Sequence, residues 1–187
     1  MSDNANLTNH FLIAMPGLAD RNFHHTVTYL CEHNPDGAMG IILNRPIDLH
    51  LNDILGQLDI ENIQGDAGEQ PIYIGGPVQT DRGFVLHTGA ARWDSTLQIT
   101  DSISLTTSID ILEAIANGKG PEKTLIALGY SGWGSGQLEE ELTANAWLSG
   151  PADESVIFDT PAGDRWRAAA AIIGVDLNLL SNQAGHA

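Results

Sequence analysis

The most informative stretch of this sequence is Gly129-Tyr130-Ser131-Gly132-Trp133-Gly134-Ser135-Gly136-Gln137-Leu138-Glu139. It follows an apolar run, Thr124–Leu128, and it precedes an amphipathic pattern that reaches Leu148. This succession predicts a strand, a glycine-rich turn and a helix. Such a turn can present backbone N–H groups or a nucleophile at a helix N-terminus. The segment is therefore the first candidate for a functional site.

Ser131 is the candidate nucleophile of this segment. A nucleophile elbow needs glycine two residues on either side of the serine, and Gly129 meets the first requirement, but Trp133 occupies the second position. A triad also needs a histidine and a carboxylate close to the serine in space, which a sequence does not show, and an enzyme here would use Ser131 or His87. A hydrolase-like role is therefore the weaker interpretation, and a turn that packs Tyr130 and Trp133 against the body is favoured.

Anion binding is a second alternative for residues 129–136. Gly132, Gly134 and Gly136 alternate, so their backbone amides could line an anion pocket. The segment has no Gly-Lys-Ser/Thr ending and misses the dinucleotide fingerprint, and three glutamates at 139–141 make the entrance acidic. An anion-binding enzyme at this segment is thus a weak alternative, and no catalytic residue is assigned.

Two further motifs extend the candidate surface. Asn44-Arg45-Pro46 places polar side chains at the end of an apolar run, either as recognition groups or as turn bonds. Gly75-Gly76-Pro77 lets the backbone approach a ligand or another strand closely. The predicted ligand-binding or partner-binding residues are Asn44, Arg45, Gly75, Gly76, His87, Ser131, Trp133 and Gly134.

The sequence predicts no metal site and no cofactor. His24 and His25 are adjacent, and on a strand they would point to opposite faces, so they could not ligate one ion simply. The single cysteine, Cys31, lies in an apolar run, which indicates a buried and inert thiol and excludes an internal disulfide.

The charge balance bears on the class of partner. The formal net charge is −16, from 24 acidic residues against 8 Lys plus Arg, and such a surface repels polyanions. Direct DNA binding is therefore disfavoured, because it needs clustered basic residues. No apolar run approaches the roughly 20 residues that span a bilayer, and no signal peptide is visible, so we expect a cytoplasmic protein.

The 187 residues predict one domain, 1–187, with residues 1–9 flexible. Strands come in groups and do not alternate strictly with helices, which favours an α+β fold. The predicted strands are 11–15, 26–31, 38–43, 71–74, 83–87, 96–99, 102–105, 124–128 and 155–158, and the predicted helices are 51–58, 107–117 (capped by Thr107), 137–148 and 161–173.

Seven motifs together resemble the YqgE/AlgH family: Met15–Phe23, Glu32-His33, Gly37–Gly40, Asn44-Arg45-Pro46, Gly75–Val78, Gly83–His87 and Gly129–Glu139. The resemblance covers essentially the whole chain. It implies a bacterial cytosolic α+β domain with a curved, partly barrel-like mixed β-sheet flanked by helices.

Members of that family carry the label of transcriptional regulators, without an established reaction or cofactor. Nothing in this sequence resembles a helix-turn-helix with a basic recognition face. We therefore expect any regulation to act indirectly, through a protein partner or a small ligand. The sequence leaves the oligomeric state open.

Overall fold

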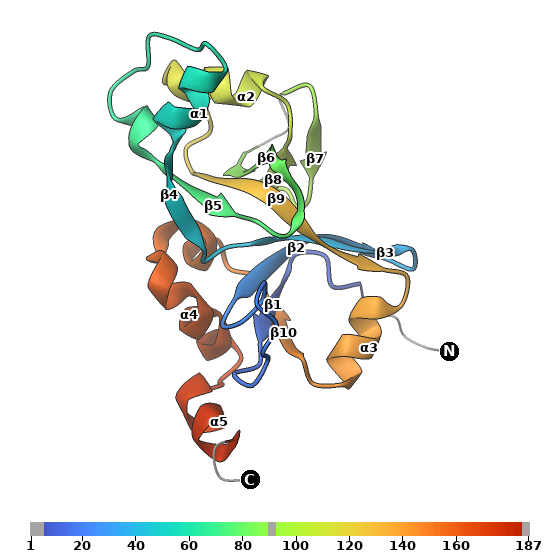
Figure 1. Cartoon of the computed structure of the whole chain (residues 1–187). Coiled ribbons are helices and arrows are strands. Elements are labelled where there is room, and N and C mark those ends of the chain that lie inside the picture. The colour runs from blue at the N-terminus through green and yellow to red at the C-terminus, as the bar shows by residue number, and fades with distance from the viewer. Residues whose placement is uncertain (1–5, 90–92, 185–187) are drawn as a thin grey trace.

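The computed structural model describes residues 6–89 and 93–184, with side chains as far as residue 180. Within this part of the chain, ten strands form one sheet (Figure 1). The strands are β1 (His10–Ala14), β2 (Val27–Asn34), β3 (Gly37–Ile42), β4 (Pro46–His50), β5 (Pro71–Ile74), β6 (Val78–Thr88), β7 (Thr96–Gln98), β8 (Ile103–Thr106), β9 (Thr124–Gly134) and β10 (Trp147–Pro151).

Five α-helices and three shorter helical turns accompany the sheet in the described ranges. The α-helices are α1 (Leu51–Gln57), α2 (Asp110–Ala116), α3 (Gln137–Thr143), α4 (Arg165–Ile172) and α5 (Leu177–Ala184), and the turns are η1 (Ala67–Glu69), η2 (Ser155–Asp159) and η3 (Ala162–Asp164). Figure 1 shows α1 and α2 at one end of the molecule, with α3 and α4 on either side of the other end.

The strand order is β10-β1-β2-β3-β9-β6-β8-β7, with β5 beside β9 and β4 beside β5. Neighbouring strands are antiparallel, except that β5 runs parallel to β9. The sheet curls strongly between its two ends (Figure 1). The prediction of an α+β fold with a curved, partly barrel-like mixed sheet is therefore confirmed.

Strand β9 joins the two halves of the sheet. Its first residues pair with β5 and β6, and its last four, Ser131–Gly134, pair with β3. Between them, Gly129 has a φ of +76°, a left-handed conformation that glycine adopts without steric cost. The glycine at this position lets one strand pair with β5 and β6 in one half and with β3 in the other.

Three hydrophobic clusters hold helices against the sheet. The largest contains Phe11, Tyr29, Ile41 and Trp166 and packs α4 on one face of the β1–β3 half. On the opposite face, α3 packs through a smaller cluster: Leu12, Ala14, Leu30, Trp133, Leu138 and Trp147. The third cluster packs α1 and α2 on the other half: Leu51, Leu55, Ile72, Val85, Ile111, Leu112, Ile115, Ala116 and Ile126.

Two predicted elements after residue 130 are wrong. Residues 129–134 are not a turn, because they continue β9, and only Ser135 and Gly136 turn before α3. The helix predicted for 137–148 ends at Thr143, since Asn145 takes a left-handed φ of +61°. The remaining residues, from Trp147, form β10 and pair with β1.

Two more predictions fail for local hydrogen-bonding reasons. Residues 155–158 form a helical turn and not a strand, because the Asp153 side chain accepts hydrogen bonds from the N–H and hydroxyl of Ser155. Thr107 does not cap α2, which begins at Asp110 after Ile109. The Thr107 N–H instead donates to the Ser95 carbonyl. The sequence pattern also missed β4 and α5.

The N-terminal segment predicted to be flexible, residues 1–9, lies partly outside the described residues. Within the described part, the Leu7 N–H donates to Nδ1 of His33 at 2.9 Å. Asn9 accepts a hydrogen bond from the Tyr29 hydroxyl at 2.8 Å. Among the described helices, none is long and apolar enough to cross a membrane.

Candidate functional site

Asn44 and Arg45 hold a loop. The Asn44 amide donates to the His25 carbonyl at 2.9 Å, and its oxygen accepts from the Val27 N–H at 3.1 Å. The Arg45 guanidinium donates to the carbonyls of Arg21 and His24, both at 2.9 Å. Of the two alternatives for this motif, the turn bond is the one observed. These bonds fix residues 15–26, the segment between β1 and β2, which we call the histidine loop.

Gly75 and Gly76 let two backbones cross closely. A Cβ at Gly76 would collide with the Tyr130 carbonyl group, and one at Gly75 with the Gly129 carbonyl oxygen. The Gly75 carbonyl accepts the Ile42 N–H at 2.8 Å, which ties this crossing to β3. The close approach predicted for these glycines is therefore made to strand β9.

Ser131 lies inside the same crossing. It is fully buried, and its hydroxyl donates to the Gly75 carbonyl at 3.2 Å. Among the residues that the structure describes, no histidine is hydrogen-bonded to Ser131. A nucleophile needs an adjacent base and access for substrate, and this serine shows neither. The geometry gives Ser131 a structural role.

Trp133 is an anchor for α3 and the histidine loop. It is 5% exposed and packs near Phe23 and Trp147, with ring centroids 6.0 and 6.1 Å away. The Trp147 indole N–H donates to a Glu141 carboxylate oxygen at 3.1 Å, and the Trp133 indole contacts the same oxygen at 3.4 Å. Trp133 therefore stabilises the fold from the interior.

His87 does not join the other predicted site residues. It lies opposite Thr124, at the far end of β9 from Ser131, and it is fully buried. Its Nδ1 is bonded to the Thr88 carbonyl at 3.0 Å and its Nε2 to the Thr106 hydroxyl at 2.7 Å. Burial lowers the pKa of His87, and the bond to Thr88 opposes this only in part.

Gly132 and Gly134 differ from the glycines of the crossing. Both are exposed, and both lie on one face of β9, alternating with the buried Ser131 and Trp133. A Cβ at Gly134 would meet only the Gln137 side chain, at 3.9 Å, and one at Gly132 only the Tyr130 ring, at 3.3 Å. Neither position has a left-handed φ. The fold therefore does not require glycine at either position.

The backbone at Gly132 faces a free sheet edge. The Gly134 N–H donates to Oε1 of Gln137 at 2.9 Å, and hence not to β3. Along an antiparallel strand, the backbone N–H and C=O groups of successive residues point alternately toward and away from the neighbouring strand. Gly132 is two residues from Gly134, so its N–H and C=O also point away from β3. On that side β6 begins at Val78, opposite Tyr130, so within the described residues no strand runs beside Gly132. We call Gly132, Gly134 and this free stretch of β9 the glycine edge.

An open groove of about 500 Å³ adjoins the glycine edge, and no Lys or Arg lines it. Its acidic residues, Glu32 and Asp36, are exposed. The lining residues are Glu32, Asn34, Asp36, Gly37, Ala38, Met39, Val78, Tyr130, Gly132 and Trp133. Of the predicted site residues, only Gly134 and Trp133 belong to this region. The alternation of glycines was the signal for it, although it marks a strand and not a turn.

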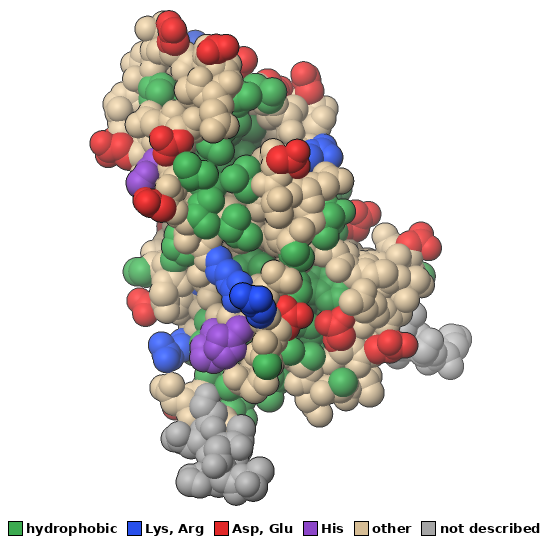
Figure 2. Space-filling view, in the orientation of Figure 1, with side chains coloured by type: hydrophobic (Ala, Val, Ile, Leu, Met, Phe, Trp, Pro, Cys, Tyr) green, Lys and Arg blue, Asp and Glu red, His purple; other side chains and the backbone are tan. Residues whose placement is uncertain are grey.

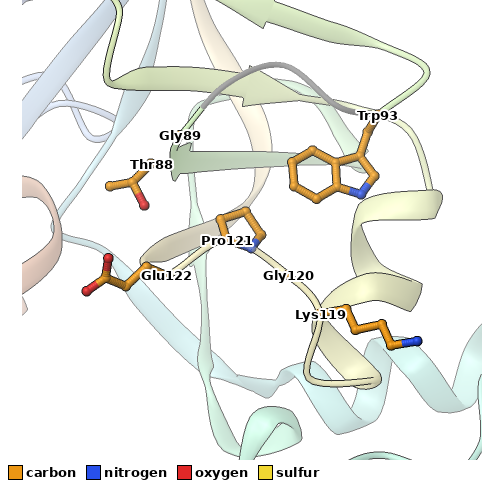
Figure 3. A pocket seen from close by; sticks show the side chains of 7 residues that line it. All are labelled: Thr88, Gly89, Trp93, Lys119, Gly120, Pro121 and Glu122. Atoms are coloured by element: carbon orange, nitrogen blue, oxygen red, sulfur yellow. The ribbon is translucent and has the colours of Figure 1, made fainter.

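Two other hollows lie away from the predicted site residues. Figure 3 shows the first, of about 330 Å³, in which the Trp93 ring faces Pro121 while Lys119 and Glu122 point away. The second, about 570 Å³, lies between α1, α2 and β6, and its only basic lining residue is Arg82. Neither hollow contains a predicted site residue.

The described part of the chain holds no cluster of metal-ligating side chains, and its cysteine is buried. No group of three or more His, Cys, Asp or Glu side chains there could hold a metal ion. Cys31 is buried, and burial raises the pKa of its thiol strongly, as expected for an inert cysteine.

Comparison with known proteins gives consistent matches. A family model described as AlgH-like matches residues 11–178. The chain is 57% identical over 179 residues to a UPF0301 protein of Nitrosococcus oceani, which covers 96% of both chains. It is 56% identical over 187 residues to a UPF0301 protein of Thioalkalivibrio sulfidiphilus, with both chains covered completely.

Two solved structures are similar over nearly the whole chain. The solution structure of the AlgH protein from Pseudomonas aeruginosa matches with a TM-score of 0.81 and 54% identity, covering 100% of this chain and 99% of that one. A crystal structure from Corynebacterium diphtheriae matches with a TM-score of 0.75 at 20% identity, covering 97% of this chain and 94% of that one. The second comparison extends the fold to a distant sequence.

Proposed function

The chain belongs to the AlgH-like family, and from that premise we propose that it is a regulatory protein that binds an extended segment of a partner polypeptide. The partner segment lies along the glycine edge as an added strand. Regulation, including any effect on transcription, then runs through that partner and not through direct contact with DNA. The proposal places this interaction in the cytoplasm.

The observation that carries the proposal is the pair of exposed glycines in β9. Glycine weakens a strand, because it loses more backbone entropy on folding than other residues and offers no side chain to pack. Gly132 and Gly134 are not required by the fold, since a Cβ at either would meet only one side chain. A glycine in this setting allows another backbone to come close.

The edge and its charge indicate the kind of partner. A free stretch of strand can pair with an extended peptide through main-chain hydrogen bonds, and a neighbouring groove can take its alternate side chains. The groove here carries Glu32 and Asp36 and no basic residue, on a chain of net charge −16. A segment that contains Lys or Arg complements this surface.

This binding function needs no catalytic residue. Ser131 is buried beneath the crossing at Gly75, and His87 lies at the far end of β9. The backbone N–H groups of residues 129–134 belong to a strand, so they do not converge on an anion. No specific observation favours an enzyme at this segment over a binding surface.

Selection from a library of random peptides displayed on phage tests the proposal. The immobilised protein should select peptides that are enriched in Lys and Arg. Each selected peptide is then titrated by fluorescence anisotropy against the wild type and Gly132→Val. We expect about a tenfold or greater loss of affinity, because the valine side chain would fill part of the groove that takes the alternate side chains of the added strand.

Gly83→Val is the matched control. Gly83 is also a strand glycine with open space around it, but it lies on β6, away from the glycine edge. Peptides that bind Gly132→Val as tightly as the wild type would exclude the glycine edge as the docking site. Selection of acidic peptides would contradict the assigned charge of the partner.

A further inference from the structure

The histidine loop gathers basic side chains on an otherwise acidic protein. Three of the eight Lys and Arg residues, Arg21, Arg45 and Arg167, border it. Figure 2 shows Lys or Arg side chains next to His side chains on one face of the molecule. Among the described residues, no carboxylate forms an ion pair with any of these arginines or with the two loop histidines. Because the Arg45 guanidinium already donates to two loop carbonyls, Arg21 and Arg167 are the cations available to a ligand.

Three aromatic rings are stacked within this patch. The rings of His24 and His25 lie 3.8 Å apart at an interplanar angle of 21°. His25 in turn lies 4.2 Å from the Trp166 ring, at 16°. Trp166 is buried and its indole N–H donates to the Ala14 carbonyl at 2.9 Å. The stack thus has a fixed base at Trp166 and ends in the exposed ring of His24. The two histidines lie in a loop and not on a strand, so their rings stack and do not point to opposite faces.

The loop is held in an uncommon conformation to make this stack. His25 has a φ of +55°, a left-handed conformation that histidine adopts more often than most non-glycine residues. Asn44 and Arg45 hold the carbonyls of His25 and His24 in place. Strained backbone that neighbouring side chains fix in this way is concentrated at binding sites. The Asp20 carboxylate, the nearest acid along the loop, is hydrogen-bonded to the Asn22 N–H.

We propose that the histidine loop binds a mononucleotide, whose base extends the Trp166–His25–His24 stack and whose phosphate contacts the bordering arginines. Nucleobases stack on aromatic rings. Guanidinium groups pair with phosphate oxygens, often through two hydrogen bonds. The net charge of −16 repels a long polyanion, whereas a mononucleotide carries only a small negative charge. This site uses residues different from those of the glycine edge.

NMR titration with AMP and UMP tests the site. Each nucleotide at millimolar concentration should shift the backbone amides of the histidine loop and the indole N–H of Trp166. Adenosine, ribose 5-phosphate and inorganic phosphate serve as partial ligands, and each should bind more weakly than AMP. His24→Ala should weaken AMP binding about tenfold, because it removes the outer ring of the stack.

Two variants separate a site effect from a folding or charge effect. The Trp166 indole resonance shows whether the stack base of His24→Ala is still folded, since that N–H is bonded to Ala14. Arg167→Ala should also weaken AMP binding, whereas Lys119→Ala, which removes one exposed charge elsewhere, should not. Binding of inorganic phosphate as tight as that of AMP, or AMP binding unchanged by His24→Ala, would overturn the proposal. Tighter binding of an oligonucleotide than of AMP would also overturn the proposal.

Discussion

Single residues in this protein often have roles other than those their type suggests. His87, a potential catalytic base, is instead buried and bonded to Thr88 and Thr106. Because burial lowers its pKa, the folded protein keeps this ring neutral at pH values where the unfolded chain already binds a proton. The buried ring therefore links stability to pH.

We expect the free energy of unfolding to fall as the pH drops below about 6.5, the ordinary pKa of histidine. In that window the unfolded state takes up more protons, and one histidine contributes at most about 1.4 kcal/mol per pH unit. Urea unfolding at pH 7.5 and 5.5 measures the effect. His87→Gln should reduce the difference between the two values, and His50→Gln, at an exposed histidine, should not. If the free energy of unfolding changed equally between the two pH values in His87→Gln and in the wild type, this assignment would be contradicted.

Ser131 offers a simple test of structural against chemical function. Its hydroxyl donates to the Gly75 carbonyl, which also accepts the Ile42 N–H. Ser131→Ala should cost about 1 kcal/mol of stability, the net value of one buried hydrogen bond. Thermal and urea unfolding measure this loss. Peptide binding at the glycine edge should be unchanged in the same variant, and a large loss of binding with no loss of stability would give the hydroxyl a direct role.

Asn44 and Arg45 show where reasoning from sequence stops at the residue scale. The sequence singled out these two polar side chains before a proline, and the structure shows that they hold a loop. Their partners, however, are backbone carbonyls about 20 positions earlier in the chain. No local pattern records such a pairing. The stacking of His24 on His25 was missed for a related reason, since it depends on a loop conformation that those distant bonds maintain.

At the scale of elements, the glycines of β9 and its crossing fall into two kinds. Gly76→Ala should cost about 3 kcal/mol or more, because its Cβ would collide with backbone at Tyr130, which cannot move aside. Gly134→Ala should change stability by no more than about 0.5 kcal/mol, since space is open there and alanine lowers the entropy of the unfolded chain. Urea unfolding of the two variants side by side measures the contrast. Similar losses in both would contradict the distinction on which the glycine edge is based.

Elements that depend on local pattern were predicted well. Strands β1, β2, β3 and β5 coincide with apolar runs, and the buried face of α4, with Trp166 and Ala169, follows its periodicity. The strand β10 could not be predicted in this way. Trp147 and Leu148 continue the preceding helical pattern, and it is pairing with Ile13 and Ala14 of β1 that makes them a strand. Hydrogen bonds made across such a separation leave no local signal.

The candidate site was only partly predictable for the same reason. The glycine alternation of residues 132–136 drew attention to the segment that contains the proposed glycine edge. Its interpretation as a turn failed because pairing with Gly37–Gly40 of β3 extends β9 through Gly134. The acidic lining of the groove, Glu32 and Asp36, comes from the β2–β3 hairpin and could not be assigned to it from sequence.

On the scale of the whole molecule, β9 makes the two halves interdependent. It supplies Ala127 to the cluster that packs α4 and Ile126 to the cluster that packs α1 and α2. Unfolding of β9 would therefore disrupt the cores of both halves at once. We expect one cooperative unfolding transition. In urea titrations followed by NMR, the indole resonances of Trp93 and Trp166, one from each half, should disappear at the same midpoint. Two distinct midpoints would show that the halves unfold independently.

The position of β1 has a consequence for synthesis on the ribosome. This N-terminal strand lies between β2 and β10, and β10 ends only at Pro151. When only the first hundred residues of a nascent chain have emerged, β10 and β9 are still missing. One edge of β1 and one edge of β3 are therefore unpaired at that stage. Bare strand edges pair readily with other chains. During translation these edges therefore stay unpaired until residues up to Pro151 have left the exit tunnel.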